Sequence, residues 1–475
     1  MNFDKDLSAR QEARDLASQA ADAQKLLARL PQEKLDAIVE ATAKAFSAQA
    51  PALAQMAVEE TGFGNIEDKI TKNRFAADTV AQALRGMKTV GLLREDRERK
   101  LWEIGVPMGA IAAIVPSTNP TSTVCYKALI ALKSGCSIVF SPHPKAIACT
   151  RQAAKIVAEA AEAAGAPAGS VTCLGIPSLQ GCQELMASPH IRLILATGGP
   201  AMVKAAYSSG KPAIGVGAGN GPAYIHHSAD VRQALTQILR SKTFDNGTVC
   251  ASEQSIIVEK SLEDTVLREA KNLGFYLMNP EEAKSLSRLL FKPNGALSPD
   301  VVGKTAQHLA RMAGFSIPSG TKILVARERE AGPSVPYSME KLCPVLAFYV
   351  MEDQEAVLSK VMEVLGHEGS GHTFVMHCNE ESVIRKFAAH VPVSRFLVNT
   401  PAALGGIGST TGLFPALTLG CGAIGGSSSS NNISPLDLIN IRRVAWGTQQ
   451  PNTPQPQFDP ALVDLLTRKI LEKLG

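Results

Sequence analysis

The N-terminal part of the chain carries apolar side chains at a helical spacing. They recur every three or four residues on both sides of Pro31: Leu16, Ala20, Ala23, Leu27 and Leu30 before it, and Leu35, Ile38, Val39 and Phe46 after it. This spacing places apolar side chains on one face of a helix. The pattern therefore predicts covering helices over about residues 8–60.

The pattern changes after Lys100, where short β-rich runs alternate with helix-length segments. The predicted strands are Ala110–Val115, Ser137–Ser141, Val171–Leu174 and Arg192–Ala196. Ala-rich segments near 121–134, 145–164 and 199–208 lie between and after them and are predicted to be helices. This alternation is typical of an α/β fold with a parallel, doubly wound sheet and crossover helices. A nucleotide site is expected at the C-terminal edge of such a sheet.

A second α/β region is predicted from about residue 244 to 430. Its strand candidates are Ser255–Val258, Lys322–Val325, Val345–Val350, Thr373–His377 and Phe396–Asn399. Two further segments, Arg99–Ile104 and Ile441–Trp446, are predicted to pair as an appended sheet. Exposed sheet edges of that kind commonly join subunits.

The C-terminal tail differs from the rest of the chain. Residues 447–457 are an uncharged Pro/Gln-rich stretch, which predicts a linker. After it, 458–475 begins with a capping residue, Asp459, and with Pro460 at the first helical position. Apolar residues then repeat every four positions: Leu462, Leu466, Ile470 and Leu474. This predicts an amphipathic helix on a tether, which either docks on its own or a neighbouring subunit or serves as a helical peptide for a partner.

Composition excludes several classes of protein. The chain has 475 residues, of which 45% are hydrophobic and 19% charged, so it can bury a sizeable core and is not mainly disordered. The net charge of +4 is small for this length and no long Lys/Arg run exists, so no nucleic-acid partner is expected. The uncharged stretches Ile104–Tyr126 and Asn399–Asn432 are broken by Pro, Gly, Ser and Thr, so no membrane span is predicted.

Cysteine usage and the N-terminal sequence favour a cytoplasmic location. The nine cysteines are scattered and form no CxxC pair, which fits a reducing compartment. The N-terminus, MNFDKDLSARQEARD, is charged where a signal peptide would be apolar. His143 and the His226–His227 pair lack a partner spacing for a metal ion, so no metal site is predicted.

The most informative stretch for chemistry is Thr243–Gln254, with the sequence TFDNGTVCASEQ. Its cysteine, Cys250, lies in a polar, glycine-containing loop before a predicted strand, where a side chain can project into a cleft. A single cysteine is more often a buried, small apolar side chain than a nucleophile. The residues alone leave both interpretations of Cys250 open.

Further motifs follow in order along the chain. They are VPSTNPTST at 115–123, FSPHP at 140–144, ATGGPAMVKAA at 196–206, GKPAIGVGAGNGPA at 210–223, EKLCPV at 340–345, GHT at 371–373 and LTLGCGAIGG at 417–426. Together with FDNGTVCASEQ, they resemble the aldehyde dehydrogenase superfamily over about residues 10–446. The resemblance is strongest to its coenzyme A-acylating branch, which includes the aldehyde half of bifunctional aldehyde-alcohol dehydrogenases and aldehyde enzymes of bacterial microcompartments.

This resemblance implies a division of the chain into domains. A Rossmann-type cofactor-binding domain would span residues 1–243, with 99–106 contributing to a small oligomerisation sheet. An α/β catalytic domain would span 244–430, and 431–446 would complete the oligomerisation sheet. The expected assembly is a homodimer or a homotetramer.

The resemblance assigns catalytic roles to two residues. Cys250 would be the nucleophile, because a thiolate attacks an aldehyde carbon and later leaves from a thioester. Asn119 would donate its side-chain amide to the oxyanion, together with the backbone N–H of Cys250. Taken alone, Asn119 before Pro120 is a turn-forming residue. Because the motifs match the family in the same order along the chain, the catalytic role of Asn119 is favoured.

The resemblance also marks residues for a nicotinamide cofactor. Thr197, Gly198 and Gly199 precede a predicted helix, where backbone N–H groups and the helix dipole can hold pyrophosphate. Glu340 matches the family's nicotinamide-ribose carboxylate. Without the resemblance, Thr197–Gly199 would be interpreted as an ordinary strand-to-helix turn and Glu340 as a solvated loop residue. The other predicted contacts are Pro116, Ser117, Thr118, Ser141, Pro142, His143, Val216, Gly217 and Leu342. The literal GxGxxG at 420–425 runs into a Ser-rich loop and is discounted.

One position departs from the hydrolysing relatives. These usually carry a Glu in a motif such as ELGGKSP, where it activates water against the thioester. Here Val216 occupies that position, and a valine cannot take a proton from water. The thioester would therefore be released to coenzyme A, the acceptor of the branch with GVGAGN.

Two further points concern His372 and the choice between NAD and NADP. His372 either helps to position or deprotonate the CoA thiol or is an ordinary hydrogen-bonded histidine at a strand start. Pro144 stands where many NAD-preferring relatives have a Glu, which permits NADP without requiring it. Ser141 replaces the usual Lys, so the family's ribose contact is altered here.

These inferences predict an oxidoreductase that converts a short aldehyde, CoA and NAD(P)+ into acyl-CoA and NAD(P)H. Propionaldehyde and acetaldehyde are the favoured substrates, and succinate semialdehyde and sulfoacetaldehyde are the less favoured ones. A dehydrogenase that releases free acid and a scaffold protein without turnover are the competing hypotheses. The tail at 458–475 resembles microcompartment encapsulation peptides, so a shell protein is a predicted partner and a microcompartment in the cytoplasm a predicted location.

Overall fold

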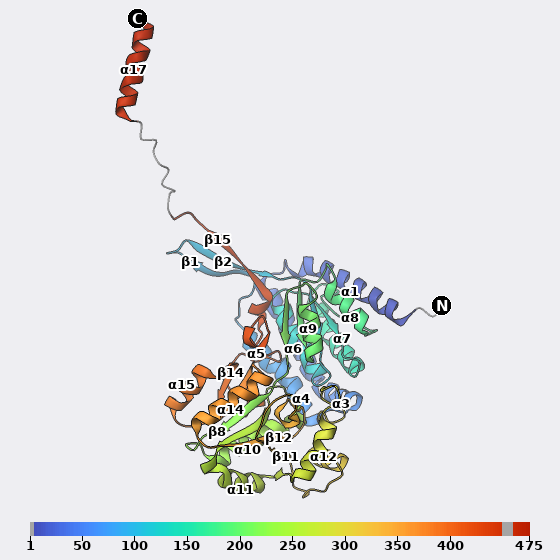
Figure 1. The fold of residues 1–475 in the computed structure, drawn as a ribbon. Coiled ribbons are helices and arrows are strands. Elements are labelled where there is room, and N and C mark those ends of the chain that lie inside the picture. The colour runs from blue at the N-terminus through green and yellow to red at the C-terminus, as the bar shows by residue number, and fades with distance from the viewer. Residues whose placement is uncertain (1–3, 449–458) are drawn as a thin grey trace.

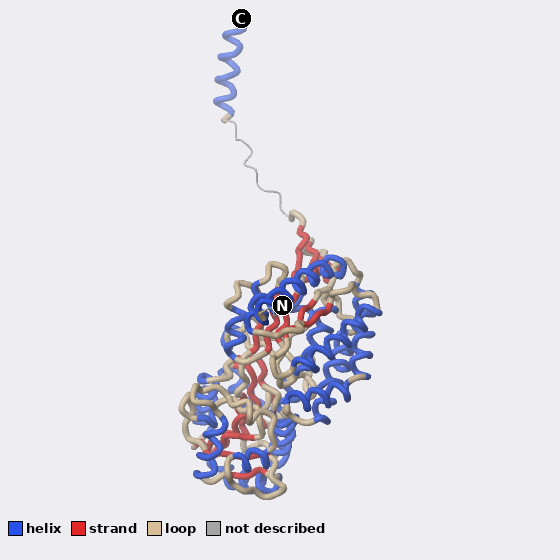
Figure 2. Tube along the Cα trace, turned by 90° about the vertical axis from the view of Figure 1, so that its right-hand side faces the viewer, coloured by secondary structure: helices blue, strands red, loops and turns tan. Residues whose placement is uncertain are grey.

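The computed structural model describes residues 4–448 and 459–475. Strands run through the middle of the body, and helices lie on both sides of them (Figure 2). The described strands form three sheets, and the two larger ones are parallel throughout. The predicted α/β class is confirmed.

Helices form the N-terminal part, as the apolar spacing predicts. They are α1 (Lys5–Leu27), α2 (Gln32–Ala48), α3 (Ala50–Thr61), α4 (Ile66–Arg74) and, after a π-helical turn over Phe75–Thr79, α5 (Val80–Leu84). Alanines form the buried stripe of α1, and this small-residue stripe lets α1 approach α8 (Leu179–Ala187) closely. Gly181 of α8 lies against Ala9 of α1. A Cβ added at Gly181 would lie only 3.1 Å from the Ala9 Cβ.

The first sheet has the strand order β5-β4-β3-β6-β7. Its strands are β3 (Ile111–Ile114), β4 (Ile138–Ser141), β5 (Val171–Cys173), β6 (Leu193–Thr197) and β7 (Ala213–Val216). The connecting helices are α6 (Pro120–Lys133), α7 (Ile147–Ala163), α8 and α9 (Pro200–Tyr207). Every residue of α6 is buried, because the helix packs between the sheet and the N-terminal helices. The predicted strands and helices of this region are confirmed within a few residues.

The second sheet has the order β10-β11-β12-β9-β8-β13-β14. Its strands are β8 (Gly221–Ile225), β9 (Glu253–Glu259), β10 (Phe275–Leu277), β11 (Ile323–Arg327), β12 (Val345–Met351), β13 (Gly371–His377) and β14 (Val393–Val398). Its helices are α10 (Val231–Thr243), α11 (Glu263–Leu273), α12 (Pro280–Leu290), α13 (Ala306–Met312), α14 (Gln354–His367), α15 (Glu381–His390) and α16 (Ala402–Gly406). The five predicted strands are present, and the sequence analysis missed β8 and β10.

Strand β8 changes the predicted domain boundary. It lies within 1–243, yet it pairs with β9 and β13 in the second sheet. The chain therefore passes from one sheet to the other at 217–220, ahead of the predicted boundary at 243. The reason is that β7 and β8 are both short and buried, so their sequences do not reveal which sheet each one joins.

The third sheet is antiparallel, with the order β1-β2-β15. Strands β2 (Leu101–Pro107) and β15 (Ile439–Ala445) pair as predicted for 99–104 and 441–446. The sequence analysis missed β1 (Gly91–Asp96). The sheet projects from the body (Figure 1). On it, the rings of Trp102 and Trp446 pack edge to face, with their centroids 4.9 Å apart.

The C-terminal helix is present as predicted. Helix α17 spans Pro460–Leu474, Asp459 caps it, and all of its side chains are exposed. Most of the predicted linker at 447–457 lies outside the described residues. None of the described helices is long and apolar enough to cross a membrane.

Candidate active site

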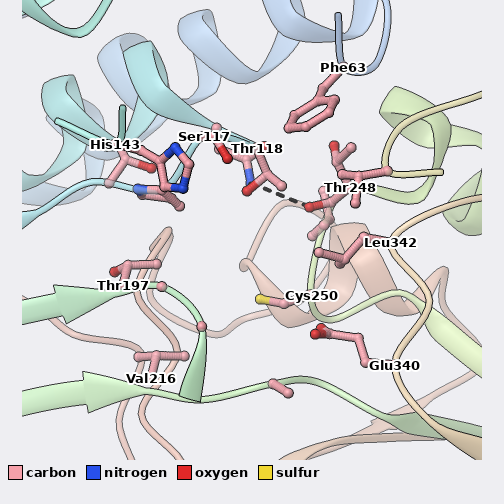
Figure 3. A pocket seen from close by; sticks show the side chains of 18 of the residues that line it. Phe63, Ser117, Thr118, His143, Thr197, Val216, Thr248, Cys250, Glu340 and Leu342 are labelled. Carbon is pink, nitrogen blue, oxygen red and sulfur yellow. Dashed lines mark hydrogen bonds between the residues drawn. The ribbon is translucent and has the colours of Figure 1, made fainter. Parts of the chain in front are cut away.

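A cavity of about 470 Å³ lies where the two larger sheets meet. The carboxyl ends of β3, β6 and β7 face it from the first sheet, and Cys250, just before β9, faces it from the second. It brings together most of the predicted site residues: Pro116, Ser117, Thr118, Asn119, His143, Thr197, Gly198, Gly199, Val216, Gly217, Cys250, Glu340 and Leu342. Figure 3 shows the Cys250 sulfur and the Glu340 carboxylate pointing into the same space.

A strained turn positions Cys250. In the 3-10 segment Phe244–Gly247, Asp245 and Asn246 have φ angles of 47° and 52°, which few residues other than glycine adopt. The buried Asp245 carboxylate holds this turn. It accepts hydrogen bonds from the backbone N–H of Asn65 at 2.9 Å and from the Thr248 hydroxyl at 2.7 Å. Gly64 is required beside it, because a Cβ there would lie 1.8 Å from Asp245 Oδ1.

Two buried lysines of α4 neutralise Asp245. Lys69 Nζ lies 3.0 Å from Asp245 Oδ2, and Lys72 Nζ also donates to this oxygen. Burial alone would raise the pKa of Asp245, but the two ammonium groups hold it below its ordinary value. Burial lowers the pKa of Lys72 to about 8 despite the ion pair. Both ammonium groups contact the same carboxylate oxygen, so the three side chains form one buried ionic cluster beside the cavity.

Lys72 also orients the Asn119 amide. Lys72 Nζ donates to Asn119 Oδ1, so the amide oxygen is occupied by the lysine. The Asn119 side-chain NH2 group remains available as a donor. It makes only long contacts, to Thr118 Oγ1 at 3.2 Å and to Thr248 O at 3.4 Å. Asn119 precedes α6 without capping it. The side chain is therefore free to donate to a group in the cavity, as an oxyanion donor must.

The thiol of Cys250 is neutral in this environment. Burial raises the pKa of Cys250 to about 12, and the nearby Glu340 carboxylate adds to the shift. The buried Arg395 acts in the opposite direction. Its guanidinium donates to the backbone oxygen of Gly420 at 2.7 Å and to that of Gly371 at 3.3 Å. A positive charge brought into the cavity would favour the thiolate.

Glu340 is the one carboxylate among the described residues that line this cavity. The backbone N–H of Gly219 donates to Glu340 Oε1 at 2.8 Å, and the backbone N–H of Glu340 itself donates to Glu368 at 2.6 Å. Burial, together with the Glu368 carboxylate, raises the pKa of Glu340 to about 8. Val216 lies at the end of β7 and presents an apolar side chain to the cavity.

The family model of the aldehyde dehydrogenase family matches residues 5–274. The chain belongs to this family. It is 45% identical over 435 residues to the bifunctional aldehyde-alcohol dehydrogenase AdhE of Escherichia coli, which covers 90% of this chain and 49% of that protein. The chain thus spans about half the length of this curated relative.

Solved structures agree with this assignment. An acetylating aldehyde dehydrogenase from Geobacillus thermoglucosidasius is 49% identical, with a TM-score of 0.92 over 94% of this chain and 99% of that chain. A propionaldehyde dehydrogenase from Rhodopseudomonas palustris, solved with bound CoA and an acylated cysteine, is 28% identical, with a TM-score of 0.83 over 91% and 97% of the two chains. The predicted family and fold are confirmed.

The structure places three predicted residues of this aldehyde dehydrogenase away from the main cavity. Ser141 and Pro142 line a neighbouring space of about 380 Å³, which shares His143 and Gly199 with the main cavity. His372 is fully buried behind Gly219, where a Cβ would lie 3.2 Å from its ring, and it does not line the cavity.

The environment of His372 opposes a positive charge. Burial holds the pKa of His372 well below its usual value, and the charge of Arg395 adds to this shift. Its Nδ1 lies 2.9 Å from Thr373 Oγ1, while Nε2 has no hydrogen-bond partner among the described residues. Both shifts oppose protonation of the ring, and the predicted role of His372 toward the CoA thiol stays a prediction.

The sequence analysis missed the residues that support the nucleophile and the oxyanion donor. Lys69 and Lys72 are spaced by three on α4, so they share one face of the helix. That spacing was a usable signal, but two lysines on a helix are normally exposed. Their burial follows only from the position of α4 against the Asp245 turn, which sequence spacing does not reveal.

Proposed function

We propose that this aldehyde dehydrogenase is CoA-acylating: it oxidises a short aldehyde to acyl-CoA and reduces NAD(P)+. The observation that carries the proposal is Val216. It lines the cavity with Cys250, at the position where hydrolysing relatives have a Glu that activates water. An apolar side chain there leaves the thioester without that base.

The cavity fits a nicotinamide cofactor. Gly199 precedes α9, and the first N–H groups of a helix have no partner within it, so they can bind phosphate. The ionisable side chains of the wall include Lys145 and His143, which suit a pyrophosphate, and Glu340, which suits ribose hydroxyls. A bound nicotinamide supplies the hydride acceptor and a positive ring that favours the Cys250 thiolate.

In the oxidation half, the Cys250 thiol loses its proton to solvent, and the thiolate sulfur attacks the aldehyde carbon to form a C–S bond. The carbonyl oxygen becomes an oxyanion and accepts hydrogen bonds from the Asn119 amide and the Cys250 backbone N–H. Lys72 keeps the Asn119 amide in the donor orientation. Loss of hydride from the carbon restores the carbonyl group and leaves an acyl thioester on Cys250.

In the acylation half, the CoA sulfur attacks the thioester carbon. The new C–S bond to CoA forms, the bond to Cys250 breaks, and the proton of the CoA thiol returns to the Cys250 thiolate. For His372 to position or deprotonate the CoA thiol, as the sequence predicts, its fully buried ring would have to become accessible from the cavity. The exchange needs no activated water, which is consistent with Val216.

The cavity favours an uncharged, short aldehyde. Apolar side chains form much of its wall: Phe63, Val302, Leu342, Ile407, Leu417 and Leu419. A carboxylate or sulfonate on the substrate would need a free cation. Lys72 is already paired with Asp245, Lys145 is the residue proposed to face the pyrophosphate, and among the described residues of the wall no arginine is present. Propionaldehyde and acetaldehyde are therefore preferred over succinate semialdehyde and sulfoacetaldehyde.

The test is NAD(P)H formation from propionaldehyde by the purified protein, with and without CoA, with the product identified by mass. Strict CoA dependence and formation of propionyl-CoA are expected. Equal rates without CoA and release of propionate would show that another base activates water. Running NAD+ and NADP+ side by side tests the proposal that Pro144, which brings no carboxylate near the adenosine ribose, permits both.

We also infer that α17 is a docking peptide for a microcompartment shell protein. The apolar residues of α17 are exposed: Leu462, Leu466 and Ile470 are 54%, 52% and 57% exposed. Deleting 458–475 is expected to leave kcat and the oligomeric state unchanged and to disperse the enzyme in cells. A deletion that breaks the oligomer would favour docking between subunits, for which the projecting sheet with Trp102 and Trp446 is the proposed site.

A further inference from the structure

A group of metal-binding side chain types lies at the end of the second sheet that is opposite to the active site. Cys250 precedes β9, so the active site lies at the amino ends of the strands. His226 and His227 follow β8, Glu259 ends β9, and Glu380 follows β13. Strand β8 lies between β9 and β13 and is parallel to both. Their carboxyl ends therefore bring these side chains together, at the sheet edge where α/β folds commonly bind ligands.

The spacing of the donor atoms suits one small cation. One ring nitrogen of each histidine and a carboxylate oxygen of Glu380 all lie within 4.8 Å of one another. His227 Nε2 and Glu380 Oε1 are 3.3 Å apart. Two ligands of a tetrahedral zinc ion, each bound at about 2.0–2.1 Å, are separated by about 3.3 Å. This pair already has the required spacing.

The two histidines have further polar neighbours. The Tyr224 hydroxyl donates to Glu259 Oε1 at 2.7 Å, and His227 Nδ1 lies 3.9 Å from the same oxygen. His226 Nδ1 lies 2.8 Å from Ser228 Oγ and accepts from the Ser228 backbone N–H at 3.2 Å. Ser228 therefore fixes the orientation of the His226 ring.

Burial gives the group a fixed side and an open side. His226 is fully buried, whereas His227 and Glu380 are 57% and 45% exposed, so an ion and its water can enter from solvent. The thiol of Cys378 lies 3.5 Å from His226 Nδ1 and 3.5 Å from Ser228 Oγ.

The sequence predicts no metal site at His226–His227, because Glu380 joins the pair only in the folded chain. We propose that His226, His227 and Glu380 bind a divalent transition metal ion, with Zn2+ as the best match and water completing the coordination. Two imidazoles and one carboxylate form a donor set that zinc uses, whereas Mg2+ and Ca2+ prefer oxygen donors throughout. The site is independent of the aldehyde chemistry, because it lies at the other end of the strands that carry Cys250 and His372.

The test is Zn2+ binding to the full-length protein by isothermal titration calorimetry, carried out on the Cys250→Ala variant so that the reactive thiol does not bind the ion. One Zn2+ per chain is expected. His227→Ala and Glu380→Gln should each weaken binding by about 10-fold or more. Both side chains are partly exposed, so neither change should unfold the protein, and circular dichroism checks this. His190→Ala, at an exposed histidine elsewhere, is the matched control and should bind Zn2+ as before.

Visible absorption of bound Co2+ gives a second measurement that is independent of calorimetry. Co2+ bound by the same three side chains should show the visible absorption of a low-coordinate site, lost in His227→Ala, whereas Mg2+ should not compete for it. Absence of Zn2+ binding would overturn the proposal. Binding that survives both His227→Ala and Glu380→Gln would overturn it as well.

Discussion

The two larger sheets contribute to the active site in opposite ways. The first sheet offers loops at the carboxyl ends of its strands, with small residues and backbone groups such as Gly198, Gly199 and Ser117. The second sheet and its loops offer partly exposed, ionisable groups whose pKa values are displaced, among them Cys250 and Glu340. Apart from Asn119, the proposed oxyanion donor that follows β3, the first region binds through its backbone, whereas the second supplies the groups that react. Substitutions in the two regions should therefore alter different kinetic constants.

The largest effect is expected at the nucleophile. Cys250→Ala removes the atom that attacks the aldehyde, so kcat should fall about 10⁴-fold or more. Binding of NAD+ should persist, because the first sheet carries the phosphate-binding backbone. Fluorescence titration with NADH measures this binding. Acyl-CoA production by this variant would contradict the assignment of Cys250.

The next largest effect is expected at Lys72. Lys72→Met removes the group that occupies Asn119 Oδ1, and loss of an oriented oxyanion donor typically costs about 10²-fold in kcat. The KM for NAD+ should change little. Lys69→Met is the matched control, because Lys69 contacts Asp245 and the Thr118 backbone but not Asn119. Equal losses of kcat in both variants would show that Lys72 acts on the turn and not on the donor.

A pH-dependent effect on stability is expected at Glu340. Its folded-state pKa of about 8 lies above the ordinary value of a Glu, so the folded protein holds this proton more tightly than the unfolded chain. The resulting stability is present below about pH 4.5 and is lost as the pH rises to about 8. Relative to Glu340→Gln, the wild type should lose on the order of 2–4 kcal/mol across this range. Urea unfolding of both proteins at several pH values measures the difference, and parallel curves would contradict the buried, protonated state.

The smallest effect is expected in the first sheet. A Cβ at Gly199 would meet no atom within 4 Å, so Gly199→Val should fold normally. Its side chain would stand where the phosphates approach α9, so the KM for NAD+ should rise about 10-fold while kcat stays similar. A fall in kcat at an unchanged KM would show that the two regions do not divide the work in this way.

Much of the fold could be predicted from the sequence, because hydrophobic spacing reports burial within each element. The alternation of strands and helices in the first sheet is one example, and the helical spacing before Pro31 is another. Strand β8 could not be assigned to its sheet, because a short buried run such as 221–225 carries no information about its neighbours. Sheet order depends on contacts between residues far apart in the chain.

The candidate site shows the same limit. Cys250, Asn119 and Glu340 lie in sequence motifs, and the structure brings them to one cavity. Lys72 and Asp245 were missed, because their role depends on charges that meet only in the folded protein. His372 lies in a motif but is buried behind the cavity wall, a depth that a three-residue motif does not reveal.

The most direct test of CoA acylation is a single turnover followed by intact mass. Enzyme, NAD+ and propionaldehyde are mixed without CoA, and the mass of the protein is followed over time. A propionyl group is expected to persist on Cys250, to leave as propionyl-CoA when CoA is added, and to be hydrolysed faster in Val216→Glu. Rapid loss of the acyl group from the wild type as propionate, without CoA, would contradict the central claim that Val216 leaves the thioester for a thiol acceptor.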